Sequence, residues 1–128
     1  MRVLLDTHAL LWWLTDDPGL SRPARAVMAD VGNQVLVSAA SAWEIATKVR
    51  LGKLPGATPL VAEFTQHLQR EHFDALPVTL EHGIRGGLLP GPHRDPFDRM
   101  LIAQAQCEGL PIVSNDKAFD DYKIRRIW

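Results

Sequence analysis

Short apolar runs recur along the chain, and each has the length of a strand that is buried on both faces of a sheet. The first run, RVLL, stops at Asp6, as a buried strand of a parallel sheet does. The runs that predict strands are 2–5, 34–38, 73–78, 111–114 and 124–128. Together they predict a sheet of four to five strands.

The segments between these runs predict helices, because they have helical patterning and end signals. Ser21 suits an N-cap, with Pro23 just inside that helix, and Gly32 and Gly52 follow helix ends. The predicted helices are 8–17, 21–32, 39–52, 59–72, 79–87 and 96–109, the last one preceded by a glycine- and proline-rich loop at 88–94. Strands that alternate with helices indicate an α/β fold with three layers, α/β/α, around a mostly parallel sheet. We expect residues 1–128 to form a single domain.

Two aspartates stand three positions apart in the stretch HRDPFDRMLIA, at the start of the last long helix. Asp95, followed by Pro96, suits the N-cap and first helical positions, so capping explains it fully. Asp98 suits the third position, where an acid favours the helix dipole. It also lines up with the apolar positions Leu101 and Ile102, where a purely capping acid is out of place. Capping and a functional role are equally good interpretations of Asp98.

Three other acids stand near the starts of predicted helices. Asp6 ends the first strand and suits an N-cap or a functional site equally well. Glu44 closes a capping box with Ser41 and pairs with Lys48 one turn later, so the periodicity favours a structural role. Asp116 follows a predicted strand, and a turn or cap explains it adequately.

Asp6, Glu44, Asp98 and Asp116 nevertheless share one location in the predicted fold. In a parallel sheet the junctions from strand to helix gather at the carboxyl edge, where ligands bind. Two unit charges about 4 Å apart repel by roughly 4 kcal/mol at an effective dielectric of about 20. Several such pairs would strain a domain whose whole stability is about 5–15 kcal/mol. The crowding therefore predicts protonated acids or a bound cation, and an all-oxygen site suits Mg²⁺ or Mn²⁺.

Composition excludes several classes of protein without pointing to one. A chain with 46% hydrophobic and 23% charged residues is typical of a globular domain. The single cysteine, Cys107, excludes an internal disulfide and favours a reducing compartment. Asp6 and His8 interrupt the apolar N-terminal stretch, and no run is long enough to span a bilayer, so we expect a cytoplasmic protein without membrane contact. A net charge of -1 argues mildly against nucleic-acid binding, so a basic patch would have to be local.

Four sequence blocks resemble the PIN-domain ribonucleases, and more narrowly the VapC-like toxins of bacterial and archaeal toxin–antitoxin pairs. The blocks are LLDTHALLWWL, SAWEIATKVRLGKL, HRDPFDRMLIAQA and IVSNDKAFDDY, they occur in the family's order, and the resemblance covers essentially the whole chain. It implies a PIN-like fold and places the family's acids on Asp6, Glu44, Asp98 and Asp116. For Glu44 the resemblance overrides the structural interpretation that periodicity favours.

The resemblance implies a metal-dependent endoribonuclease that uses Mg²⁺, with Mn²⁺ able to substitute. Asp6, Asp98 and Asp116 would hold the metal, and Glu44 would be a ligand or position the attacking water. A cognate antitoxin would inhibit the enzyme, which would work as a homodimer or in a hetero-oligomer with that antitoxin. The supporting residues are Ser114, Asn115, Asp95 and His93, and the basic residues that could meet RNA phosphates are Lys48, Arg50, Lys53, Arg94, Arg99 and Lys117.

Two other functions stay open from the sequence. A PIN-like module that binds RNA or protein without cutting would share the same fold. A receiver-type signalling domain also gathers acids around Mg²⁺, but this chain has no acidic pair after its first strand. Met100 and Cys107 lie off the apolar stripe of their helix and indicate a second buried side, as a dimer contact would require.

Overall fold

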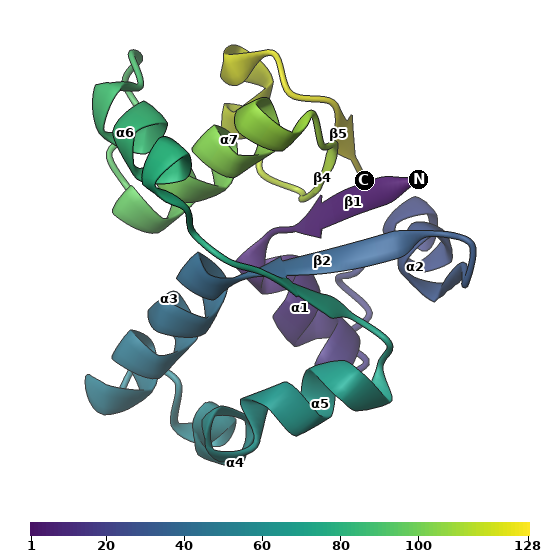
Figure 1. Cartoon of the computed structure of the whole chain (residues 1–128). Helices are drawn as coiled ribbons and strands as arrows, with labels where there is room; N and C mark the ends of the chain where they lie inside the picture. Colours follow the sequence, from purple (N-terminus) through teal and green to yellow (C-terminus); the bar gives the residue numbers. More distant parts are fainter.

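The centre of the molecule is a sheet of five parallel strands in the order β3-β2-β1-β4-β5, seen in a computed structural model that describes residues 1–128 (Figure 1). The strands are β1 (Arg2–Leu5), β2 (Gln34–Ser38), β3 (Asp74–Leu76), β4 (Ile112–Val113) and β5 (Arg126–Ile127). All four neighbouring pairs are parallel, with Leu4 opposite both Leu36 and Ile112. The predicted α/β fold is confirmed, and its sheet is parallel throughout.

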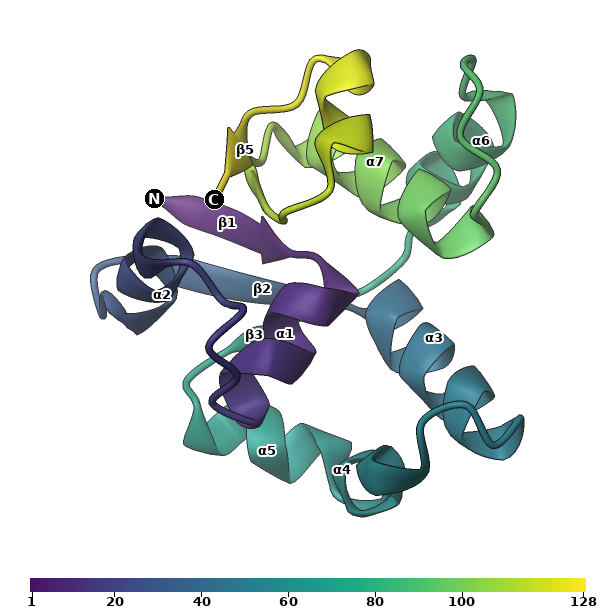
Figure 2. The same cartoon turned by 180° about the vertical axis from the view of Figure 1, so that it is seen from behind.

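Helices cover both faces of this sheet (Figures 1 and 2). The α-helices are α1 (Thr7–Leu14), α2 (Arg22–Ala29), α3 (Ala39–Arg50), α4 (Thr58–Ala62), α5 (Phe64–Arg70), α6 (Leu80–Leu88) and α7 (Pro96–Glu108), and the short 3-10 helices are η1 (Pro55–Ala57) and η2 (Lys117–Tyr122). Helices α1, α2 and α5 lie on one side of the sheet, and α7 lies on the other. This arrangement gives the predicted three layers. No helix combines the length and apolar character needed to cross a membrane.

Two hydrophobic cores lie on opposite faces of the sheet, because successive side chains of a strand point to opposite faces. Val3 and Leu5 of β1 belong to the core that packs against α1, α2 and α5. Leu4, between them, belongs to the core that contains Leu101 and Ile102 of α7. Every interior residue of β1 is therefore buried, which explains the uninterrupted apolar run at the N-terminus.

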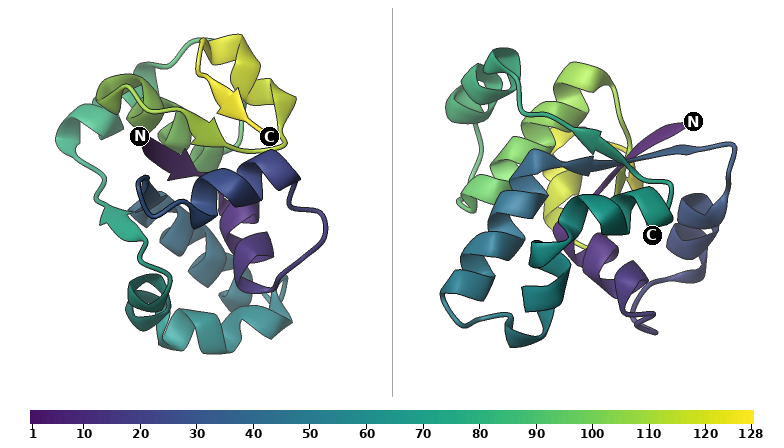
Figure 3. Two further views of the ribbon diagram at one scale, coloured as in Figure 1. Left: turned by 90° about the vertical axis from the view of Figure 1, so that its right-hand side faces the viewer. Right: turned by 60° about the horizontal axis from the view of Figure 1, so that its bottom comes forward.

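The pattern predicted one helix over residues 59–72, but the structure has two, α4 and α5. The chain leaves helical geometry at Glu63, with φ -129° and ψ 38°, and this residue separates α4 from α5. The two helices meet at an angle beyond the end of α3 (Figure 3). The break lets Leu60 of α4 and Phe64 of α5 both pack against the first core, which explains why a single amphipathic pattern spans the two helices.

The second buried side predicted for α7 is real, but α6 of the same chain covers it. Ala103 and Gln104 are fully buried, and a Cβ at Gly86 of α6 would lie 3.6 Å from the Cβ of Ala103. Met100 and Cys107 are only partly buried. The predicted second side therefore gives no support to a dimer contact.

Candidate active site

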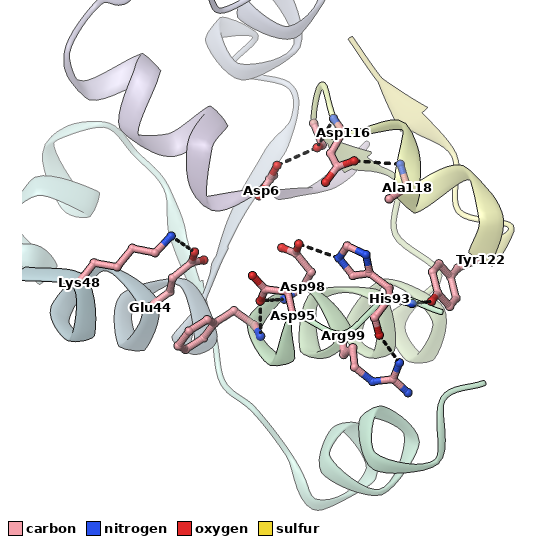
Figure 4. Close-up of polar contacts among 12 residues, drawn as sticks. Asp6, Glu44, Lys48, His93, Asp95, Asp98, Arg99, Asp116, Ala118 and Tyr122 are labelled. Atoms are coloured by element: carbon pink, nitrogen blue, oxygen red, sulfur yellow. Dashed lines mark hydrogen bonds and ion pairs between the residues drawn. The ribbon is translucent and has the colours of Figure 1, made fainter. Parts of the chain in front are cut away.

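A pocket of about 420 Å³ opens at the carboxyl edge of the sheet, where α1, α3, α7 and η2 begin. Its lining residues are Asp6, His8, Trp12, Glu44, Lys48, Asp95, Asp98, Asn115 and Asp116. All four acids that the sequence singled out therefore lie in one pocket, although they are spread over more than a hundred positions of the chain (Figure 4). A larger pocket of about 780 Å³ between α6 and η2 contains none of the predicted site residues.

Asp6 occupies the N-cap position of α1 but makes no side-chain capping bond. Its Oδ2 instead accepts a hydrogen bond of 2.7 Å from the hydroxyl of Ser114, at the end of β4. The same hydroxyl oxygen accepts a bond of 3.0 Å from the backbone N–H of Asp116. Asp6 is only 4% exposed, and this burial raises the pKa of its carboxyl, with Glu44 adding to the rise. Ser114 thus links two of the acids.

Glu44 does not form the capping box that its spacing from Ser41 predicted. Helix α3 begins earlier, with Ser38 as the N-cap, and Ser41 lies inside the helix, where its hydroxyl accepts from that of Thr7. Glu44 is only 4% exposed, because α3 packs against both α1 and α7. The buried residues of α3 lie on one face and are Ala40, Ser41, Glu44 and Ile45. Two of them are polar, so the pattern of apolar residues alone misplaces this face.

The two oxygens of the Glu44 carboxylate have different surroundings. Oε2 accepts a hydrogen bond of 2.6 Å from the ammonium group of Lys48, one turn along α3, and this bond raises the pKa of Lys48. Oε1 is buried and has no hydrogen-bond partner. A buried carboxylate oxygen without a donor is costly, so Oε1 is ready to accept a bond from a ligand in the pocket.

Asp98 points into the pocket and does not cap its helix. Its Oδ2 lies 2.8 Å from Nε2 of His93, and both side chains are about one fifth exposed. Burial raises the pKa of Asp98 to about 6, against the opposing effect of the bond to His93, and the charges of Asp95 and Asp6 contribute to the rise. The capping role at this helix belongs to Asp95, whose Oδ1 accepts from the backbone N–H groups of Phe97 and Asp98.

The loop before α7 is fixed at both ends, and it carries His93 into the site. The backbone N–H of His93 donates to the hydroxyl of Tyr122, and its carbonyl accepts from Arg99 at 2.6 Å. Arg99 also donates to the carbonyl of Leu89. Gly91 has φ 103°, and a Cβ there would lie 2.7 Å from the Tyr122 hydroxyl, so the loop needs glycine at this point.

Asp116 combines a capping bond with a place in the pocket. Its Oδ1 accepts from the backbone N–H of Ala118 at the start of η2, as the turn interpretation predicted. One ligand atom each from His93, Asp98 and Asp116 can be chosen so that all three lie within 4.8 Å of one another. These donors, the partnerless Oε1 of Glu44 and the nearby Asp6 carboxylate are the nitrogen and oxygen groups that divalent cations accept in proteins. The residues present therefore fit a divalent metal ion.

Of the basic residues proposed for RNA contact, only Lys48 lines the pocket. Arg99 is turned towards the loop carbonyls, and Lys117 and Arg94 are exposed outside the pocket. Asn115 lines the pocket, while Ser114 lies behind Asp6.

Two residues that line the pocket, His8 and Trp12, are not among the predicted site residues. Their position just after Asp6, on the first turns of α1, is the signal that could have found them. The Trp12 ring packs against that of Trp128, with centroids 5.7 Å apart. Nearby, the exposed Trp43 meets Phe97 edge to face, with centroids 4.8 Å apart.

Comparison with known proteins identifies the family to which this arrangement belongs. The PIN domain matches residues 3–124, nearly the whole chain. The chain belongs to the PIN domain family. The resemblance predicted from the four sequence blocks is confirmed, and the receiver-type alternative is excluded.

Two curated relatives of this PIN domain are ribonucleases of Mycobacterium tuberculosis. Ribonuclease VapC22 is 26% identical over 122 residues, which cover 94% of this chain and 92% of that protein. Ribonuclease VapC16 is 43% identical over 58 residues, so the match spans only 45% of this chain and 40% of that relative.

Solved structures share the fold of this PIN domain over most of its length. VapBC2 from Rickettsia felis, bound to a promoter DNA fragment, superimposes with a TM-score of 0.72 at 15% identity and covers 100% of both chains. A toxin–antitoxin complex from Klebsiella pneumoniae matches with a TM-score of 0.55 at 14% identity and covers 90% of this chain and 87% of the other. At these identities the likeness concerns the fold.

Proposed function

We propose that this PIN domain is a divalent-metal-dependent endoribonuclease and the toxin of a toxin–antitoxin pair. The observation that carries the proposal is the pocket in which Asp6, Glu44, Asp98 and Asp116 meet, although none of them follows another closely in the sequence. The names of the curated relatives, both ribonucleases, support hydrolysis of RNA as the reaction.

In this proposal Asp98 and Asp116 hold Mg²⁺, or Mn²⁺ in its place, and Asp6 binds it directly or through water. A bound divalent ion lowers the pKa of a coordinated water and offsets negative charge on the phosphodiester. Ser114 orients the Asp6 carboxylate through its 2.7 Å hydrogen bond. His93 fixes the carboxylate of Asp98 in the same way.

Glu44 and Lys48 act as a unit on the opposite wall of the pocket. Oε1 of Glu44 accepts a hydrogen bond from the attacking water and so orients it, because this oxygen is buried and has no donor within the chain. Lys48 holds the other oxygen at 2.6 Å, which fixes the direction of Oε1. About one third of the Lys48 side chain is exposed, so its ammonium group can also meet a substrate phosphate.

We further propose that a cognate antitoxin protein is the partner that inhibits the enzyme. The support is the fold shared with VapBC2 and with the toxin–antitoxin complex from Klebsiella pneumoniae. The assembly in this proposal is a homodimer, or a hetero-oligomer with the antitoxin.

The test is cleavage of RNA by the purified chain, freed of any antitoxin, with Mn²⁺ or Mg²⁺ and with EDTA. We expect metal-dependent cleavage by the wild type and a loss of at least about a hundredfold in Asp6→Asn, because one metal-binding carboxylate is removed. Asp121→Asn is the matched control, since Asp121 is exposed and lies outside the acidic pocket.

A wild type that binds RNA but cuts none with either metal would favour the competing function, a PIN-like module that binds without cleaving. Equal cleavage by the wild type and Asp6→Asn would also contradict the proposal, because it would point to a contaminating nuclease. Binding of RNA by the variant distinguishes loss of catalysis from loss of folding.

A further inference from the structure

His93 lies among the acids of the pocket, yet it comes from a loop and not from a helix start. Its Nε2 is 2.8 Å from Oδ2 of Asp98, and one of its ring nitrogens lies within 4.8 Å of donor atoms of both Asp98 and Asp116 (Figure 4). The side chain is 21% exposed, and the ring lies at the edge of the pocket, beside its lining residues Asp98 and Asp116.

The spacing of His93 and Asp98 suits a shared metal ion. An ion with bonds of about 2.1 Å to two ligands at right angles separates the ligand atoms by about 3.0 Å. The observed separation of 2.8 Å between nitrogen and oxygen is close to this value. A metal ion can therefore bind in place of the hydrogen between Nε2 of His93 and Oδ2 of Asp98, and that proton leaves for solvent or for Nδ1 of the ring.

The loop is built to hold the ring in this position before any ion binds. The hydroxyl of Tyr122 accepts from the backbone N–H of His93, and Arg99 binds the carbonyl of the same residue. Both backbone groups of His93 are thus fixed by side chains from outside the loop. These bonds fix the backbone of His93, and the 2.8 Å contact with Asp98 orients its ring.

A second observation points to a ligand in the same pocket. Glu44 is only 4% exposed, and its Oε1 has no hydrogen-bond partner within the chain. Glu44 lines the same pocket as Asp98 and Asp116, so this pocket contains an acceptor that the protein leaves without a donor.

We propose that His93 is a nitrogen ligand of the metal ion and that the mixed nitrogen and oxygen site binds Mn²⁺ in preference to Mg²⁺. The inference rests on the proposed metal-dependent function and changes the expected ligand set. Mn²⁺ accepts carboxylate oxygens as Mg²⁺ does, but as a transition-metal ion it also accepts imidazole nitrogen, whereas Mg²⁺ favours oxygen ligands and keeps several waters. A site built from carboxylates alone would lack the nitrogen ligand that favours Mn²⁺ over Mg²⁺.

The experiment is pulsed electron paramagnetic resonance on Mn²⁺ bound to the full chain, prepared with ordinary histidine or with histidine labelled with the heavy nitrogen isotope. We expect a nitrogen coupling that changes with the label in the wild type and is absent in His93→Gln. His8→Gln is the matched control, because His8 is the histidine among the residues that line the pocket, and it should keep the coupling.

Metal affinities give an independent measurement on the same proteins. His93→Gln should lose at least about tenfold in affinity for Mn²⁺ and much less for Mg²⁺, so the preference between the two ions falls. The melting temperature in EDTA shows whether the variant is folded. If it is not, the labelled wild type and His8→Gln still decide the assignment.

Bound Mn²⁺ without a histidine coupling in the wild type would overturn the assignment of His93 and leave the nuclease proposal intact. A coupling lost in His8→Gln would move the ligand to His8 and overturn the proposal equally. A wild type that binds neither ion would contradict the metal-dependent function itself, so the two failures are distinguishable.

Discussion

At the scale of single residues, the carboxylates of the pocket differ in how the chain offsets their charge. Glu44 has the ammonium group of Lys48 at 2.6 Å. Asp6 has the neutral hydroxyl of Ser114, with smaller contributions from His8 and the backbone of Thr7, and Asp98 has the ring of His93. The pKa values of Asp6 and Asp98 are both raised, chiefly by burial. Burial therefore disfavours the charged form of both Asp6 and Asp98.

Replacing Asp98 by Asn should leave the metal-free protein at least as stable as the wild type. The amide removes a charge that burial disfavours, and it can still accept a hydrogen bond from His93. We expect a gain on the order of 1 kcal/mol in EDTA, after allowance for solvent exposure. With Mg²⁺ or Mn²⁺ present, the variant should gain less stability than the wild type, because binding to the folded state stabilises it.

Thermal melts of the two proteins with and without metal provide the measurement. A clearly lower melting temperature of Asp98→Asn in EDTA would show instead that this carboxylate is important for the structure of the helix start.

The pH dependence of stability without metal should carry the sign of a raised carboxyl pKa. In the unfolded chain Asp98 loses its proton near its ordinary pKa of 3.8, whereas in the folded chain it keeps the proton to about 6. Between these values the folded state binds more protons, so the contribution of Asp98 to stability falls as pH rises. The stability advantage of Asp98→Asn should therefore grow between about pH 4 and about pH 6 and then level off.

Denaturant unfolding of both proteins in EDTA across this range measures that difference directly. A constant difference at every pH would mean that the proton equilibrium of Asp98 is the same in both states.

At this scale the sequence predicted the contacts that neighbouring residues determine and missed those between residues far apart in the chain. Neighbouring residues predicted that Asp95 caps α7, and its bonds from the backbone N–H groups of Phe97 and Asp98 confirm it. The burial of Glu44 depends on two helices packing against α3, and the bond from Ser114 to Asp6 joins residues 108 positions apart. Neither contact is visible in a local pattern, so the family resemblance had to supply the role of Glu44.

At the scale of elements, the loop between α6 and α7 matters because it carries His93. It depends on Tyr122 of η2 and on Arg99 of α7, and its turn at Gly91 lies against the Tyr122 hydroxyl. The sequence predicted a glycine- and proline-rich loop here but not its partners. Both partners lie outside the loop, and their side chains act on its backbone, which leaves no periodic signal.

Gly91→Ala should disturb both the stability and the metal site. Alanine is strained at φ 103°, and its Cβ would lie 2.7 Å from the Tyr122 hydroxyl, which fixes His93. We expect a loss of about 2 kcal/mol and weaker binding of Mn²⁺. Denaturant unfolding and metal titration measure the two effects.

Gly52→Ala is the matched control for this change. Gly52 also has a positive φ, 72°, but a Cβ there would meet nothing within 4 Å. It should lose stability through backbone strain alone and keep the affinity for metal. Equal metal affinity of the wild type and Gly91→Ala would show that the loop tolerates the displacement of Tyr122.

At the scale of the whole molecule, the parallel order of the sheet explains why distant acids meet. Strand order β3-β2-β1-β4-β5 places β1 between β2 and β4, so Asp6 lies between α3, which holds Glu44, and the turn that holds Asp116. The sequence predicted this gathering from the alternation of strands and helices. It could not predict the angle between α4 and α5, because one amphipathic pattern serves both helices.

The contact of Trp12 with the acidic pocket on one side and with Trp128 on the other makes this indole a natural optical reporter. When a cation or a nucleotide fills the pocket, the surroundings of the ring change, and its fluorescence should change with them. The signal should disappear in Trp12→Phe. It should persist in Trp13→Phe, because the ring of Trp13 packs against Phe73 and lies outside the pocket. Occupancy can then be followed in real time on the unlabelled chain, separately from any cutting of RNA.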